Sequence, residues 1–312
     1  MRTAIISDVH GNYPALLSVI EDAEQQKVDH YVFIGDYIFD LPYSNEVVNF
    51  LIKMGNAHII KGNKEQYMRK IASVNKDNWT FNQMGAVYQT LRELSPHAYN
   101  FLNNMADETT IHLSSRVSVY AIHTPGILTP LKKNDCSSAT FRKRMLREPF
   151  THEQYLSEFS ALMNTDECKA YFEKIDASVI TFGHTHLQSY AHCGTKLIIN
   201  PGSCGQPLDF DPAAAYTIVE DMGDGYNIYE RRVSYDIETT ISESRKTTVY
   251  EKGKIWCDLV FLALRTGRDY FGTFFDIAEK IAVTKNETGE FYSNATWDEA
   301  NDVFLGIVCS TP

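Results

Sequence analysis

The sequence contains no apolar run long enough to cross a membrane. A spanning helix needs about 20 predominantly apolar residues, and the most apolar segment, residues 255–264, is interrupted by Asp258. The apolar run that follows Met1 is also too short for a secretion signal. We therefore expect a cytoplasmic protein with no membrane partner.

Cysteine pairs and positive charge are also scarce. None of the six cysteines belongs to a Cys-x-x-Cys motif, and a chain of 312 residues is long enough to fold without disulfide bonds, so reduced thiols are expected. The formal net charge of −11 disfavours a polyanionic partner, which makes nucleic acid an unlikely ligand and a nuclease the weakest option. A small phosphorylated substrate remains compatible, because bound metal ions can reverse the local charge.

Strands and helices alternate in the first part of the chain. Short apolar runs predict strands at residues 3–7, 31–34 and 57–60, and apolar periodicity predicts helices at residues 14–26 and 45–54 between them. This order is typical of parallel strands with crossover helices, an α/β fold. Further strands are predicted at residues 117–122, 178–182 and 197–199, with a closing hairpin at residues 216–220 and 226–233.

Polar residues that can bind metal follow these strands directly: Asp8, His10, Asp36, Asn63, His123, His184 and His186. Ligands bind beyond the carboxyl ends of the strands in such sheets, so we expect these side chains to meet at one edge of a sheet. Carboxylates and imidazoles with one amide suit Mn, Fe or Zn better than a site for Mg or Ca alone.

Most of these residues are ambiguous when taken one at a time. Asp8 and His10 also fit a solvated turn, Asp36 a helix cap, Asn63 a left-handed turn and His123 a buried histidine. The most specific element is Gly183-His184-Thr185-His186, because a Gly-His-x-His motif is expected by chance only about 0.02 times in this chain.

The joint pattern resembles the calcineurin-like metallophosphoesterase superfamily. Its signature runs Asp-x-His, Gly-Asp, Gly-Asn-His-Asp/Glu, His and Gly-His-x-His, and the chain has the corresponding residues in the same order over about residues 1–235. The stretch from Asn200 to Pro207 resembles the bacterial small-phosphodiesterase branch. The resemblance implies a two-sheet αββα sandwich, with helical inserts at about residues 64–110 and 127–176.

The resemblance also implies a ligand assignment and an activity. Asp8, His10, Asp36 and His186 would hold one divalent ion, and Asp36, Asn63, His123 and His184 the second. Two ions, most plausibly manganese, would supply a bridging hydroxide that attacks phosphorus in line. The implied enzyme hydrolyses phosphodiesters or small phosphoesters, with diesters preferred.

Two positions depart from the family pattern. Lys64 stands where the family has a catalytic histidine; it either stabilises the transition state beside Asn63 or pairs with Glu65. Leu208 stands where related sequences often carry arginine, and the basic residues Arg142, Lys143, Arg144 and Arg147 offer either a replacement phosphate contact or a solvated helix face.

Residues 236–312 lie outside the resemblance. Helices are predicted there at residues 255–264, 270–281 and 297–308, and we expect a mainly helical extension that packs on the domain of residues 1–235 and helps to shape the pocket. This extension and Lys64 motivate an alternative function. The superfamily includes a retromer subunit that acts mainly through protein contacts, so a metal-binding, non-catalytic scaffold of the same fold also fits.

Overall fold

The computed structural model describes residues 1–128, 151–223 and 225–308. Its strands are β1 (Arg2–Ile6), β2 (His30–Ile34), β3 (Ala57–Ile60), β4 (Glu108–His112), β5 (Ser118–Ile122), β6 (Val179–Thr181), β7 (Ser189–Cys193), β8 (Lys196–Asn200), β9 (Ala214–Asp221) and β10 (Tyr226–Val233). Its α-helices are α1 (Tyr13–Gln25), α2 (Ser44–Lys53), α3 (Asn63–Ala72), α4 (Gly85–Glu93), α5 (Pro96–Asn103), α7 (His152–Met163), α8 (Asp166–Phe172), α9 (Ile237–Ser244), α10 (Thr248–Lys252), α11 (Lys254–Thr266), α12 (Phe271–Thr284) and α13 (Asn294–Val308). Short 3₁₀ helices span Lys76–Asn78, Asn82–Met84 and Gly126–Leu128. The basic cluster at residues 142–147 lies outside the described residues.

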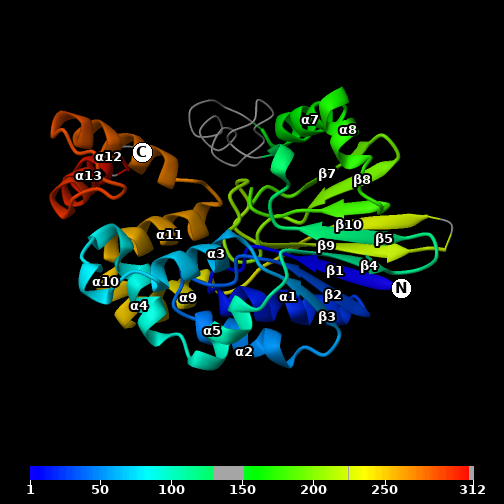
Figure 1. The fold of residues 1–312 in the computed structure, drawn as a ribbon, viewed down its shortest axis with the longest axis horizontal. Coiled ribbons are helices and arrows are strands. Elements are labelled where there is room, and N and C mark those ends of the chain that lie inside the picture. Colours follow the sequence, from blue (N-terminus) through cyan, green and yellow to red (C-terminus); the bar gives the residue numbers. More distant parts are fainter. Residues whose placement is uncertain (129–150, 224, 309–312) are drawn as a thin grey trace.

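Two five-stranded sheets form the centre of the molecule (Figure 1). The first has the order β10-β9-β1-β2-β3 and the second β4-β5-β6-β8-β7. β1, β2 and β3 are parallel, as the alternating pattern predicted, and β9 and β10 form the expected antiparallel hairpin. Both sheets are mixed, because β9 joins β1 and β4 joins β5 in antiparallel pairs.

Both faces of each sheet are covered, which explains why central strands such as β1, β2 and β8 are nearly continuous apolar runs. In β1, Ile5 belongs to a core cluster that lies between the sheets, whereas Ala4 and Ile6 face a second cluster shared with α1 and α2. A third cluster packs α7 and α8 on the outer face of the second sheet through residues such as Phe159 and Phe172. The layers are therefore helix, sheet, sheet, helix, which confirms the αββα sandwich.

The strand pattern missed two edge strands, β4 and β7. Only Ile111 of β4 is buried, and in β7 exposed residues alternate with Ser189, Ala191 and Cys193. Edge strands carry too few apolar residues for periodicity to mark them. The helices α9 and α10 were also missed, because segments of 8 and 5 residues are too short to show a helical period.

The C-terminal helices pack against the site side of the domain. A buried cluster joins Ile241, Val249 and Val260 to Leu41 and Ala86, which lie in the N-terminal part of the chain. The close approach depends on glycine: a Cβ on Gly85 would lie 1.8 Å from the Lys252 carbonyl oxygen. Within the described residues, no helix has both the length and the apolar content that a bilayer crossing requires.

Candidate metal centre

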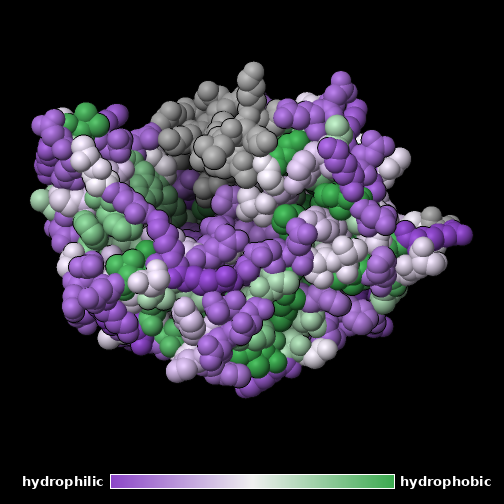
Figure 2. All heavy atoms as spheres, viewed as in Figure 1, coloured by the Kyte–Doolittle hydropathy of each residue, from purple (hydrophilic) through white to green (hydrophobic). Residues whose placement is uncertain are grey.

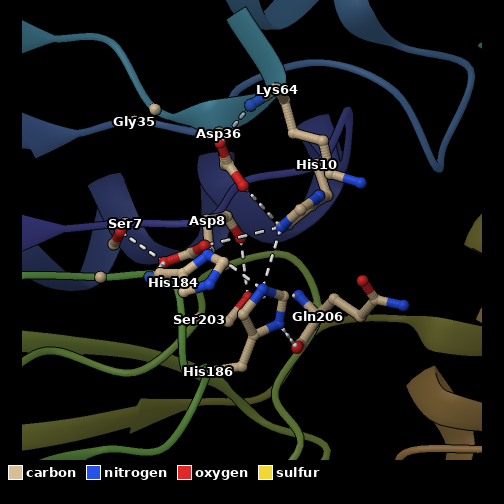
Figure 3. Close-up of polar contacts among 12 residues, drawn as sticks. Ser7, Asp8, His10, Gly35, Asp36, Lys64, His184, His186, Ser203 and Gln206 are labelled. Carbon is tan, nitrogen blue, oxygen red and sulfur yellow. Dashed lines mark hydrogen bonds and ion pairs between the residues drawn. The ribbon is translucent and has the colours of Figure 1, made fainter. Parts of the chain in front are cut away.

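The seven predicted metal ligands come from the strand ends of both sheets. Asp8, His10, Asp36 and Asn63 follow β1, β2 and β3, whereas His123, His184 and His186 follow β5 and β6 of the other sheet. The expectation of one edge of one sheet was therefore too narrow. Parallel strands in each sheet direct their carboxyl ends to a shared edge of the sandwich, where the side chains converge. Figure 3 shows this for Asp8, His10, Asp36, His184 and His186.

His10 and His186 face each other through their Nε2 atoms, which lie 3.1 Å apart. The Nδ1 atom of His10 lies 2.6 Å from Asp40 Oδ2, and that of His186 lies 2.6 Å from the carbonyl oxygen of Gln206. Because each Nδ1 faces an acceptor, the neutral rings carry their proton there and present the Nε2 lone pair. Two lone pairs directed at one point repel each other unless a cation lies between them.

Asp8 completes this first group. Its Oδ2 accepts hydrogen bonds from Ser7 Oγ at 2.5 Å and from the His184 backbone N–H at 3.0 Å. Its Oδ1 is buried and has no hydrogen-bond partner among the described residues, and it lies 3.2 Å from His186 Nε2. One oxygen is therefore anchored and the other is directed at the imidazoles.

A second group surrounds Asn63. Its Oδ1 lies 2.8 Å from His123 Nε2 and 3.0 Å from His184 Nδ1. The Nδ1 atom of His123 lies 2.6 Å from the carbonyl oxygen of Ile34, so the neutral His123 ring also presents its Nε2 lone pair. An amide oxygen and imidazole nitrogens again face one another as acceptors.

Asp36 lies between the two groups. Its Oδ2 is 3.9 Å from His10 Nε2, and its Oδ1 is 3.4 Å from His123 Nε2. A carboxylate in this position can contribute one oxygen to each of two cations.

The backbone that carries these ligands is strained. Asp8, His10, Asp36, His184 and His186 all have φ between 50° and 67°, a left-handed conformation that costs non-glycine residues about 1–3 kcal/mol each. Such conformations persist only where surrounding contacts impose them, and they concentrate at functional sites.

Motif glycines leave room for the carboxylates. A Cβ on Gly62 would lie 2.2 Å from Asp36 Oδ1, and a Cβ on Gly183 would lie 2.6 Å from Asp8 Oδ2. The glycines in Gly-Asn and Gly-His-x-His therefore have a steric cause, because a side chain at either position would displace a ligand oxygen.

The buried carboxylates and imidazoles shift one another's pKa values. Burial acts to raise the pKa of Asp36, but the positive charge of His123, the hydrogen bond with His123 and the charge of His10 together lower the pKa to about 2. Burial acts to lower the pKa of His10, but hydrogen bonds to Asp40 and Asp8 raise it to about 9. Burial also acts to lower the pKa of His123, but the charge of Asp36 and the hydrogen bond with it raise the pKa to about 10. The site therefore favours positive charge strongly.

These residues fit divalent metal ions. Two groups of residues each bring their potential ligand atoms within 4.8 Å of one another. The first group is Asp8, His10 and His186, and the second is Asp8, Asp36 and His123. Acceptor atoms converge here, the carboxylate oxygen Asp8 Oδ1 is buried among them without a hydrogen-bond partner in the described part of the chain, and imidazole with carboxylate suits Zn, Fe or Mn. The three histidine Nδ1 contacts are of the kind that orients metal-binding imidazoles.

Asp40 is a site residue that the sequence pattern missed. It is 4% exposed, and it contacts His10 Nδ1, Lys64 Nζ at 3.3 Å and Trp256 Nε1 at 2.8 Å. Asp40 is outside the family signature, and only its position four residues after Asp36 in the same loop could have indicated it.

Lys64 pairs with Asp40 and not with Glu65, contrary to one of the two expectations. Glu65 instead accepts hydrogen bonds from the backbone N–H groups of Asp36, Tyr37 and Gly62 at 2.7–3.0 Å. Burial acts to lower the pKa of Lys64, but the charges of Asp40 and Asp36 raise it.

A cavity of about 330 Å³ opens beside the ligands. It is lined by His10, Asp36, Asp40, Asn63, Lys64, His184, His186, Gln206, Leu208, Trp256, Asp269, Phe271, Gly272 and Phe275. The last five belong to the C-terminal segment, so this segment contributes directly to the pocket, as the sequence led us to expect in outline. Figure 2 shows the hollow between the C-terminal helices and the two-sheet body.

Known proteins of similar sequence support this description. A family model described as the calcineurin-like phosphoesterase superfamily domain matches residues 1–222. The uncharacterized protein MJ0912 of Methanocaldococcus jannaschii is 22% identical over 265 residues, which cover 80% of this chain and 93% of that protein.

Solved structures show the same fold. A metallophosphoesterase from Sphaerobacter thermophilus is 23% identical with a TM-score of 0.59, and the hypothetical protein PH1004 from Pyrococcus horikoshii is 17% identical with a TM-score of 0.58. Each alignment covers 86% of this chain and 99% of the other. At these identities the similarity concerns the fold alone.

Proposed function

The chain belongs to the calcineurin-like phosphoesterase superfamily, and on this basis we propose that it hydrolyses small phosphoesters, diesters in preference to monoesters, with two divalent metal ions. Manganese is the proposed metal, with iron or zinc as the other candidates. The observation that carries the proposal is the convergence of the Nε2 atoms of His10 and His186 on Asp8 Oδ1, a buried carboxylate oxygen that has no hydrogen-bond donor among the described residues.

Each ion would take ligands from both sheets. Asp8, His10, Asp36 and His186 would hold the first ion, and Asp36, Asn63, His123 and His184 the second. Support comes from the two oxygens of Asp36, which face His10 and His123 respectively. When bound, two such ions polarise the phosphoryl oxygens and supply the nucleophile near neutral pH.

Lys64 and Asn63 are the proposed catalytic residues. Lys64 lines the cavity, and Asp40 at 3.3 Å holds its ammonium group beside the metal ligands. In that position the ammonium group offsets negative charge that develops on the phosphoryl oxygens, as a point charge with three donors. Asn63 contributes a neutral oxygen between His123 and His184.

The charge of the cavity favours diesters. Among the described residues that line it, Lys64 is the one lysine or arginine, whereas Asp36, Asp40 and Asp269 are acidic. A diester carries one negative charge near neutral pH and a monoester carries close to two. Apart from the proposed metal ions, the described lining therefore offers only Lys64 to offset negative charge, and a singly charged diester matches this supply better than a monoester.

Hydrolysis of chromogenic diesters and monoesters by purified protein, with Mn²⁺, Zn²⁺ or Fe²⁺ added in turn, tests the proposal. We expect turnover that exceeds an Asp36→Asn variant by at least about 100-fold, because the substitution removes the proposed bridging carboxylate. Equal rates for both proteins across all metals and substrates would contradict the proposed hydrolysis. Partner capture that survives metal stripping, in a protein without turnover, would instead indicate a scaffold.

A further inference from the structure

Aromatic side chains of the C-terminal segment form the wall of the cavity away from the metal ligands. Trp256 in α11 and Phe271 and Phe275 in α12 all line the cavity, and each is only partly buried. The ring centroids of Trp256 and Phe271 lie 4.7 Å apart, and those of Trp256 and Phe275 lie 6.3 Å apart. We call these three residues the aromatic wall.

The aromatic wall is tied to the metal centre. Trp256 Nε1 donates to Asp40 Oδ1 at 2.8 Å, and the same carboxylate contacts His10 and Lys64 through Oδ2. Lys64 Nζ lies 5.9 Å from the centroid of the Trp256 ring. The ring therefore has a defined orientation, and it lies next to the cation proposed to contact the phosphoryl group.

Backbone contacts hold the segment in this position. The Phe210 N–H donates to the Gly267 carbonyl oxygen at 2.8 Å, which connects the end of α11 to the loop that carries Gln206 and Leu208. Gly267 has φ of 63°, and a Cβ there would lie 2.7 Å from the backbone nitrogen of Asp211. The aromatic wall is thus part of a packed structure.

Gln206 provides a polar contact on the same cavity. Its side chain is 4% exposed, and its Nε2 is buried without a hydrogen-bond partner among the described residues. A buried amide nitrogen without a hydrogen-bond partner is costly. Gln206 therefore adds a polar residue to the lining of the cavity that the aromatic wall also borders.

We propose that the substrate carries a planar aromatic group on the ester arm, and that this group stacks on Trp256, Phe271 and Phe275 while the phosphoryl group lies at the metal centre. The inference rests on the proposed function, because it names the substrate class of that site. A volume of about 330 Å³ is near the lower end of small-molecule pockets, which suits one ring system beside a phosphate. Aromatic rings stack on flat partners in offset or edge arrangements that saturated rings cannot match.

Matched diesters with a non-aromatic leaving group test the inference. Trifluoroethyl phosphodiesters with a benzyl, a cyclohexylmethyl or a thymidine 5′ arm all release trifluoroethanol, which fluorine NMR measures. We expect kcat/KM in the manganese-loaded protein to be at least about 10-fold higher for the benzyl or thymidine arm than for the cyclohexylmethyl arm. A higher value for thymidine identifies a nucleoside arm, and a higher value for benzyl identifies a simple aryl arm.

Variants of the aromatic wall connect the preference to its residues. Phe271→Leu keeps an apolar side chain and does not touch Asp40, and it should lower the benzyl preference about 5- to 10-fold. Trp256→Leu should abolish the preference and also slow all three substrates, because it removes a partner of Asp40. Phe291→Leu, which changes an aromatic residue that packs on Phe81, is the control and should retain the full preference.

Binding separates failure of this inference from failure of the proposed function. Calorimetry with benzylphosphonate and cyclohexylmethylphosphonate measures the same ring preference without chemistry. Turnover with equal kcat/KM for the benzyl, cyclohexylmethyl and thymidine arms would contradict the inferred aromatic arm but not the proposed hydrolysis. Turnover with equal affinity for both phosphonates would do the same. Absence of turnover together with tighter binding of benzylphosphonate that Phe271→Leu removes would overturn hydrolysis and keep the ring site.

Discussion

At the scale of single residues, Asp40 links three parts of the site that the sequence presents separately. Its carboxylate contacts a proposed metal ligand, His10, a proposed catalytic cation, Lys64, and an aromatic ring of the C-terminal segment, Trp256. Burial acts to raise the pKa of Asp40, but the charge of Lys64 and the hydrogen bond with His10 keep it below its usual range. Asp40 therefore stays ionised and orients its partners.

We predict that Asp40→Asn lowers affinity for Mn²⁺ by about 10- to 100-fold, the range typical for loss of a carboxylate that orients a ligand histidine. Competition with a fluorescent chelator measures the affinity. Asp77→Asn, at an exposed position on the 3₁₀ helix Lys76–Asn78, is the matched control and should bind Mn²⁺ as the unmodified protein does. Unchanged Mn²⁺ affinity in Asp40→Asn would show that Asp40 does not orient a metal ligand.

Gly183 illustrates how a small residue protects a ligand. We predict that Gly183→Ala destabilises the fold by about 1–3 kcal/mol, because its Cβ would lie 2.1 Å from Ser7 Oγ and 2.6 Å from Asp8 Oδ2 in a fully packed region. Guanidinium unfolding measures the change. Gly55→Ala is the control, since nothing lies within 4 Å of a Cβ at that position; an equal effect in both variants would contradict the steric cause.

At the scale of elements, one ion-pair network fastens α1 to the hairpin of β9 and β10. Asp22 of α1 accepts hydrogen bonds from Arg231 at 2.8 and 3.0 Å and from Tyr216 Oη at 2.6 Å. Burial acts to raise the pKa of Asp22, but these hydrogen bonds outweigh it and lower the pKa. The network holds the helix that follows the loop with the proposed ligands Asp8 and His10.

The lowered pKa of Asp22 sets how the stability of the fold depends on pH. Asp22 binds its proton less readily in the folded state than in the unfolded state, so its stabilising contribution is full above its unfolded pKa of about 3.9 and is lost as pH falls through its folded pKa. We predict that Asp22→Asn costs about 1–3 kcal/mol in unfolding free energy at pH 7 and much less near pH 2. Urea unfolding at both pH values measures the difference.

Glu24→Gln, at an exposed position on the same helix, is the control for Asp22→Asn and should change stability little at either pH. A cost of Asp22→Asn that is the same at pH 7 and near pH 2 would show that the carboxylate charge is not responsible.

The C-terminal helices share a buried apolar cluster with the N-terminal part of the chain. The division of the chain at about residue 235 stays a prediction, but the shared apolar cluster with Leu41 and Ala86 supports packing on the same domain. Sequence periodicity predicted three of the helices and a contribution to the pocket. It did not indicate which side chains would line the cavity, because helical spacing marks an apolar face without showing what that face meets.

At the scale of the whole molecule, the candidate metal centre lies between two sheets that otherwise contact each other mainly through apolar side chains. Its proposed ligands come from β1, β2 and β3 on one side and from β5 and β6 on the other. Buried carboxylates repel one another in a chain whose net charge is already −11. Bound cations would offset this repulsion and connect the sheets.

We predict that removal of metal by chelation lowers the melting temperature by several degrees. A ligand at 100 times its Kd stabilises the folded state by about 2.7 kcal/mol per site. Calorimetry before chelation, after chelation and after Mn²⁺ addition measures the effect, with metal content determined in each sample. Asp36→Asn should show a smaller shift, and a melting temperature that is the same with and without bound metal would contradict the prediction.

The sequence by itself determined the α/β class, the family and the seven candidate ligands, because each motif is local: a strand end, a glycine and a polar side chain lie within a few residues. Tertiary structure alone decided which of these strand ends belong to which sheet, that Asp40 pairs with Lys64, and that Trp256 reaches a carboxylate 216 residues away in the sequence. Contacts between distant segments depend on how the layers pack, and no local spacing in the chain records that packing.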